Sequence, residues 1–152
     1  MSDVPMTRPE EMLAIHHTKY FHSSTFVELD GGRILHAANT TFTTSDDGGI
    51  TWSDEFSKQD KNGDQVGGSG TGLCKLSGKG IGLIGMWRNP DRAKARTETY
   101  SLFWRSEDQG ETWEPPTRIT PPGIVGHAYQ DVLLRTSSGR LILPVYLSMG
   151  QG

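Results

Sequence analysis

The sequence predicts an all-β fold assembled from repeated antiparallel units. Three observations support this prediction. Short apolar runs recur along the chain without the spacing of an amphipathic helix. Gly, Asp, Ser and Pro residues, which are typical of turns, separate these runs. One eight-residue motif also occurs twice, which is typical of a chain built from repeats.

Length and composition narrow the classes of function. The chain has 152 residues, 15 basic and 18 acidic side chains and a net charge of −3, with no block of one sign. This size suits a single domain. The charge pattern argues against nucleic acid as a partner and against a polybasic patch that would bind a membrane. Cys74 is the only cysteine, which excludes an intramolecular disulfide and a zinc site built from paired cysteines.

Residues 1–21 form an N-terminal segment outside the repeats. Residues 8–15, with Thr7 as a possible N-cap, are the only stretch with helical character. The segment lacks the features of a secretory signal, and no apolar run is long enough for a membrane helix. We therefore expect no membrane span and leave the compartment unassigned, with the cytoplasm as the default for the chain as given.

The first half of the repeated unit is a β-hairpin. In each of three copies, two β-rich strands flank a tight turn that contains glycine. The expected strand pairs are 25–29 with 33–38, 72–76 with 81–87, and 131–135 with 140–147.

The second half carries the repeated motif Ser-x-Asp-x-Gly-x-Thr-Trp. Ser and Asp side chains can bond the amides of a turn, Gly supplies a positive φ, and the Trp ring is available for burial. Strands 40–44 and 100–105 precede the two motifs and complete a second hairpin in each unit. The motif residues are Ser45, Asp47, Gly49, Thr51 and Trp52, and then Ser106, Asp108, Gly110, Thr112 and Trp113.

Repeated four-stranded antiparallel units are typical of the blades of a β-propeller. Blade one is expected at about 22–57 and blade two at about 69–119, while blade three starts near 127 and has only two strands before 152. About two and a half blades cannot close a ring of four to eight. We therefore expect a fragment of a longer protein, with closure by oligomerisation or gene truncation as the alternatives.

The two motifs resemble the Asp-boxes, or BNR repeats, of the sialidase (neuraminidase) superfamily. Residues 22–29, His-Ser-Ser-Thr-Phe-Val-Glu-Leu, followed by a glycine turn, are similar to the first blade of bacterial sialidase-like proteins. The resemblance implies a six-bladed propeller that acts as an exo-glycosidase on the terminal sugars of glycans. Because Asp-boxes also occur in receptor propellers, the alternative is a non-catalytic propeller that binds glycan or protein.

Two departures from the family pattern bear on this choice. A sialidase uses a clamp of arginines, a Tyr nucleophile with a Glu partner, and an Asp acid/base. Where the family has Arg-Ile-Pro, this chain has Phe-His-Ser-Ser at 21–24. The family's long blade-one loop with its Asp is replaced by a direct passage through Asn39 into the next strand.

Blade topology predicts where a site would lie. Loops between the second and third strands share one end of the propeller with the links between blades, while the Asp-box turns lie at the other end. We expect Asp131 as the catalytic acid/base, although a carboxylate at a strand start can equally bond backbone amides. The expected substrate-binding residues are His22, Trp87, Arg88 and His127.

We expect no cofactor and no metal. The neighbouring residues His16 and His17 would face opposite sides of a strand. Residues 60–64 imitate a calcium loop, but the glycine and the final glutamate that such a loop needs are replaced by Gln65 and Thr71. That run therefore suggests a solvated connection between blades. Residues 67–70 suggest a flexible linker or a close approach of backbones, and open blade edges predict self-association.

Overall fold

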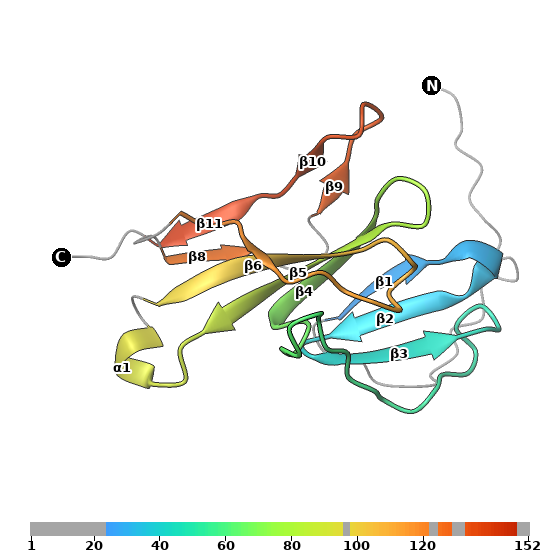
Figure 1. Ribbon diagram of the computed structural model, residues 1–152, viewed down its shortest axis with the longest axis horizontal. Coiled ribbons are helices and arrows are strands. Elements are labelled where there is room, and N and C mark those ends of the chain that lie inside the picture. Colours follow the sequence, from blue (N-terminus) through green and yellow to red (C-terminus); the bar gives the residue numbers. More distant parts are fainter. Residues whose placement is uncertain (1–23, 96–97, 122–124, 129–132, 149–152) are drawn as a thin grey trace, which may run out of the picture.

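The computed structural model describes residues 24–95, 98–121, 125–128 and 133–148 (Figure 1). Its elements are antiparallel strands, one 3-10 turn and a single four-residue helix, α1 (Arg92–Ala95). The all-β class predicted from the sequence is confirmed. The helix α1 was not anticipated; it begins where the Asp91 carboxylate accepts a hydrogen bond from the Ala93 amide at 2.9 Å. The expected helix at 8–15 lies outside the described residues.

The first sheet contains three strands in the order of the chain. β1 (Ser24–Glu28) pairs with β2 (Ile34–Ala38), and β2 pairs with β3 (Thr41–Ser45). The 3-10 turn η2 (Asp30–Gly32) joins β1 to β2, with Gly31 and Gly32 at φ of 80° and 84°. β2 and β3 are joined by Asn39 and Thr40 alone.

The second sheet has four strands, again in sequence order. They are β4 (Ser69–Lys75), β5 (Ile81–Arg88), β6 (Thr99–Ser106) and β7 (Thr117–Arg118). β5 and β6 pair along their whole length, from Ile81 opposite Ser106 to Arg88 opposite Thr99. β4 pairs with β5 from Ser69 opposite Met86 to Lys75 opposite Ile81, so the second expected hairpin, 72–76 with 81–87, is present. The strand after the second motif, β7, also joins the sheet.

The third expected hairpin, 131–135 with 140–147, is present in part, and residues 131 and 132 lie outside the described residues. β8 (Val125–Ala128) pairs with β11 (Val145–Ser148), and β9 (Leu134–Arg135) pairs with β10 (Leu141–Ile142). The two short ladders lie along one hairpin (Figure 1), whose turn is closed by a 2.8 Å hydrogen bond from the Thr136 amide to the Arg140 carbonyl. β8 packs against β5 and β6 of the second sheet.

The first unit lacks the fourth strand that the repeat predicts. The Ser53 hydroxyl accepts a hydrogen bond from the Thr44 amide at 3.0 Å, where a regular strand would offer a backbone carbonyl. Regular pairing is therefore interrupted after Trp52. The Ser53 amide still donates a 2.8 Å hydrogen bond to the Thr44 carbonyl, and the next backbone pairing with β3 is at Phe56, which exchanges two hydrogen bonds with Phe42.

The first and second sheets pack face to face around one core. β1 lies beside β4, and the Thr25 hydroxyl accepts a 3.1 Å hydrogen bond from the Leu73 amide. Alternate residues of each sheet point into the shared core, as strand periodicity requires. The core residues are Val27, Leu29, Leu35, Ala37, Phe42, Val66, Leu73, Ile81, Leu83, Trp104 and Trp113.

The connection between these sheets passes through a space that only glycine fits. A Cβ atom on Gly67 would lie 2.3 Å from the Asn39 carbonyl oxygen, and one on Gly68 would lie 2.5 Å from the Met86 carbonyl oxygen. On the facing strand, a Cβ on Gly85 would lie 2.8 Å from the Gly68 nitrogen. Of the two alternatives for this segment, the structure therefore favours the close approach of backbones.

Gly67→Ala is expected to be strongly destabilising. Gly67 combines a φ of +103° with a backbone clash, whereas Gly63 has a φ of +86° and open space around it. Gly63→Ala should therefore lose only about 1–2 kcal/mol of unfolding free energy through left-handed strain, and Gly67→Ala should lose more than about 3 kcal/mol. Urea denaturation of both variants measures the difference. Equal losses would show that the close approach contributes nothing.

Candidate functional site

The two Ser-x-Asp-x-Gly-x-Thr-Trp motifs, at 45–52 and 106–113, fold into the same hydrogen-bonded turn. We call them Asp-boxes after the motif that they resemble, as a name for the turn alone. In the first, the Ser45 hydroxyl donates to Asp47 Oδ1 at 2.8 Å, and the Thr51 amide donates to the same carboxylate at 2.8 Å. In the second, Ser106 and Thr112 make these bonds to Asp108 at 2.8 and 2.9 Å. Both Asp side chains therefore brace backbone amides and are not directed at a ligand.

The tryptophans of the two motifs are tied to the same turns. Trp52 Nε1 donates to the Gly49 carbonyl and Trp113 Nε1 to the Gly110 carbonyl, both at 3.1 Å. Trp113 is 1% exposed, whereas Trp52 is only half-buried. The same local turn therefore has different surroundings in the two units.

The hydrogen bonds of the two turns lower the pKa values of both carboxyl groups. Hydrogen bonds from the Thr51 hydroxyl and amide and from the Ser45 hydroxyl lower the pKa of Asp47 from 3.8 to about 2. At Asp108 burial acts to raise the pKa, but the bonds from Thr112 and Ser106 together outweigh it and lower the pKa to about 2. Both groups are therefore ionised throughout the neutral range.

These shifts predict a stability that depends on acid pH. The folded-state pKa lies below the unfolded value, so the stabilisation is present above about pH 4 and is lost as the pH falls toward 2. Urea denaturation at pH 5 and pH 2.5 should show a smaller difference for Asp108→Asn than for the unmodified chain. Asp54→Asn, an exposed carboxylate outside both turns, is the matched control. An unchanged pH dependence in Asp108→Asn would contradict the role of the brace.

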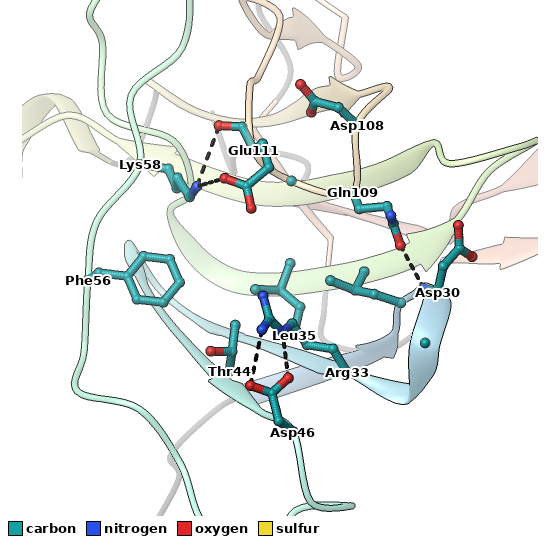
Figure 2. A pocket seen from close by; sticks show the side chains of 13 residues that line it. Asp30, Arg33, Leu35, Thr44, Asp46, Phe56, Lys58, Asp108, Gln109 and Glu111 are labelled. Carbon is teal, nitrogen blue, oxygen red and sulfur yellow. Dashed lines mark hydrogen bonds and ion pairs between the residues drawn. The ribbon is translucent and has the colours of Figure 1, made fainter.

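A cavity of about 300 Å³ lies at the Asp-box end, between η2 and the second motif (Figure 2). Four of its charged side chains pair with one another: Arg33 with Asp46 at 2.6 Å, and Lys58 with Glu111 at 3.1 Å. Gln109 Oε1 accepts a 2.6 Å hydrogen bond from the Asp30 amide across the two sheets. These contacts link the units, and they leave this cavity a poor candidate for a ligand site.

A larger cavity of about 650 Å³, here called the groove, is the better candidate. It lies between the connection at 60–69, the turn after β2, and the face of β5 and β6 that meets the first sheet. The ladders place Asn39 and Arg88 at the strand ends opposite the Asp-box turns. The groove is lined by Asn39, Thr40, Asp60, Asp64, Gln65, Gly67, Gly68, Ser69, Met86, Trp87, Arg88, Tyr100, Leu102, Trp104 and Pro116.

An aromatic pair forms part of the groove wall. The rings of Trp87 and Tyr100, which face each other across β5 and β6, stack with centroids 4.7 Å apart and an interplanar angle of 21°. The Arg118 guanidinium lies 4.3 Å from the centre of the Tyr100 ring. Trp87 remains 36% exposed, so part of its surface is available to a ligand.

Two buried polar atoms belong to residues that line the groove. Asp60 is 6% exposed, and its Oδ1 accepts hydrogen bonds from the amides of Asn62 and Asp64 at 2.8 and 3.1 Å. Asp60 Oδ2 and the indole Nε1 of Trp104 have no hydrogen-bond partner among the described residues. Such atoms are costly to bury unless water or a ligand supplies the partner.

The burial of Asp60 corrects the expectation of a solvated connection at 60–64. The Lys61 amide donates a 3.0 Å hydrogen bond to the Trp113 carbonyl, and this bond attaches the connection to the second Asp-box. Val66, which is fully buried, fixes the segment from its other end. Residues 61–64 remain exposed, so the expectation holds for them and is wrong for Asp60.

The structure places only some of the expected site residues. Trp87 and Arg88 both line the groove, and both are exposed. His127 lies on β8, where its backbone pairs with Tyr146, but its side chain is outside the described part. His22 and Asp131 also lie outside the described residues. Sequence reasoning did not anticipate Asp60, Gln65, Tyr100, Leu102 or Trp104 as groove residues.

Comparison with known proteins adds no assignment. No protein-family model matches this sequence, and no curated protein matches it. Within the described ranges, none of the helical segments has the length and apolar character needed to cross a bilayer.

Proposed function

We propose that this chain forms neighbouring blades of an Asp-box propeller of the sialidase-like type and takes a glycan in the groove. Two identically braced turns support the architecture, since they end equivalent strands of two sheets that pack face to face. A propeller needs four to eight such blades. Further sequence or further copies would supply the others.

The observation that carries the glycan assignment is the Trp87 and Tyr100 pair beside unsatisfied polar atoms. A sugar presents an apolar face of C–H groups and a rim of hydroxyls. The accessible ring of Trp87 suits the apolar face. Hydroxyls, which both donate and accept, suit the amides of Asn39 and Gln65 and the carboxylate of Asp64 along the groove.

The proposed activity of the whole protein is exo-acting hydrolysis of a terminal sugar. In this proposal Trp87 and Arg88 hold the sugar, and His22 and His127 complete the binding surface. Asp131 is the proposed acid/base. This role requires a carboxyl group within reach of the glycosidic oxygen. An arginine at the groove rim would favour an anionic sugar.

The second candidate is a propeller that binds glycan or protein without catalysis. Two observations favour it. The turn after β2 consists of Asn39 and Thr40 only, so it carries no loop with an acid/base carboxylate. Asp60, a carboxylate in the groove, has one oxygen already engaged by two backbone amides. A glycosidase needs two groups placed on either side of the scissile bond.

A glycan array combined with a turnover assay on sialosides and other glycosides separates the candidates. Release of sugar that is abolished by Asp131→Asn supports the hydrolase. Binding without release supports the non-catalytic propeller. If no glycan in the panel is bound or cleaved, the proposal of a glycan site in the groove fails.

A further inference from the structure

Three side chains from neighbouring strands form a stack on one face of the second sheet. Trp87 of β5 pairs with Tyr100 of β6, and Arg118 of β7 pairs with Leu102, which shares a face of β6 with Tyr100. The Trp87 ring centroid lies 4.7 Å from that of Tyr100, and the Arg118 guanidinium lies 4.3 Å from the same ring. Because β5 and β7 flank β6, the Tyr100 ring lies between an indole and a cation. We call these three side chains the stack.

The Arg118 guanidinium is fixed by the backbone that follows it. Its Nε donates to the Thr120 carbonyl at 2.9 Å, and its Nη2 donates to the Pro121 carbonyl at 3.2 Å. This backbone is itself attached to β6. The Ile119 amide donates to the Ser101 carbonyl at 3.0 Å, and the buried Thr120 hydroxyl accepts a 3.2 Å hydrogen bond from the Ser101 amide. The cation is therefore held in place beside β6.

The charge of Arg118 acts mainly on the Tyr100 ring. Arg33 and Arg105 each form an ion pair with a carboxylate, whereas none of the carboxylates in the described residues pairs with Arg118. An arginine over an aromatic face is attracted by the ring quadrupole. Arg118 is also absent from the described lining of the groove. Its effect on a ligand in the groove would therefore pass through Tyr100 and Trp87.

Trp87 is the member of the stack with a surface available to a ligand. It is 36% exposed and stands one residue before the end of β5. A side chain that becomes ordered only when a ligand binds loses rotamer freedom at that moment, and this loss weakens binding. A side chain already held in its bound orientation avoids the loss. The contact with Tyr100 restrains the Trp87 ring, and Arg118 restrains Tyr100 from the other face.

We propose that Arg118 is a positioning residue for the groove. It holds the Tyr100 ring against Trp87 and thereby keeps the exposed indole in one orientation before a ligand binds. The orientation of Trp87 is a property of the chain alone and can be measured without a ligand. The consequence for affinity rests on the proposed glycan site, so the two are tested by separate measurements.

The nitrogen-15 heteronuclear NOE of the Trp87 indole, measured without ligand, tests the positioning. Arg118→Gln removes the charge, and the Trp87 value should fall, whereas Arg118→Lys keeps a cation over the ring and should retain most of the value. The Trp104 indole, 2% exposed, is the internal reference and should not change. Arg105→Gln is the matched control, because Arg105 is exposed on the opposite face of β6. An unchanged Trp87 value in Arg118→Gln overturns the proposal, as does an equal fall at Trp104, which would show a general loosening of the sheet.

Isothermal titration calorimetry tests the consequence for binding, with a sialoside or other glycoside that the glycan array identifies. Arg118→Gln should bind it about two- to fivefold more weakly, the range expected for one cation–π contact, and Arg105→Gln should bind it as the unmodified chain does. A more mobile Trp87 indole with unchanged affinity overturns the role of Arg118 in binding. If the indole becomes mobile but no glycoside binds to the unmodified chain, the glycan site fails while the positioning of Trp87 by Arg118 is supported.

Discussion

Trp113→Ala is expected to lower the free energy of unfolding by about 3–5 kcal/mol, the range for removing a fully buried aromatic side chain. Trp113 is 1% exposed and packs against Phe42 with ring centroids 6.2 Å apart. It also anchors the connection between the sheets through its carbonyl bond to the Lys61 amide. The substitution therefore leaves a cavity where both sheets and the connection meet.

Trp52→Ala is the matched control for this prediction. Trp52 occupies the same place in the first motif and makes the same indole bond, but it is only half-buried. The unfolding free energy lost in Trp52→Ala should therefore be about half of that lost in Trp113→Ala, or less. Urea denaturation of both variants, followed by circular dichroism, measures the two losses. A loss at Trp52 equal to that at Trp113 would contradict the packing described for the second unit.

The second large effect is expected in glycan binding. Trp87→Ala should weaken the affinity for a glycan identified by the array by at least about tenfold, which corresponds to about 1.4 kcal/mol. The substitution removes the exposed ring surface and also the stacking partner of Tyr100. Because Trp87 is 36% exposed, we expect a smaller loss of unfolding free energy than for Trp113→Ala. Isothermal titration calorimetry measures the affinity.

Two controls accompany Trp87→Ala. Trp87→Phe retains an aromatic surface and should recover much of the affinity. Ile50→Ala removes an exposed apolar side chain outside the groove and should leave the affinity unchanged. An unchanged affinity in Trp87→Ala would show that the ligand binds elsewhere, for example on residues outside the described ranges.

The parts of the fold that are visible in the sequence are local. The turns at 30–32 and 136–139 and the two Asp-boxes are specified by Gly, Asp and Ser residues next to one another in the chain. These signals predicted the hairpins and the end of each third strand. They did not predict that the segment after Trp52 forms a single bridge with β3, with the Ser53 hydroxyl bonded to the Thr44 amide nine residues earlier.

The groove was predicted only in part because it is made of distant segments. Trp87 and Arg88 could be placed from the position of a strand end relative to the Asp-box turns. Asp60 and Trp104 could not be placed in this way. Asp60 belongs to a polar run, and the run does not reveal that its backbone is attached to Trp113 and that Asp60 is buried. Trp104 belongs to a strand, and the strand pattern does not reveal which segment lies over it. The sequence allowed two interpretations of residues 67–70, a flexible linker or a close approach of backbones. The Asn39 carbonyl beside Gly67, which only the structure shows, decides for the close approach.

The four tryptophans offer the most direct test of the proposed glycan site. Trp87 and Trp104 line the groove, while Trp52 and Trp113 are held in the Asp-box turns. In a nitrogen-15 spectrum of the indole groups, titration with a bound glycan should shift the Trp87 and Trp104 signals and leave the other two in place. Shifts confined to Trp52 and Trp113, or no shift in any indole signal at saturating glycan, would contradict the account.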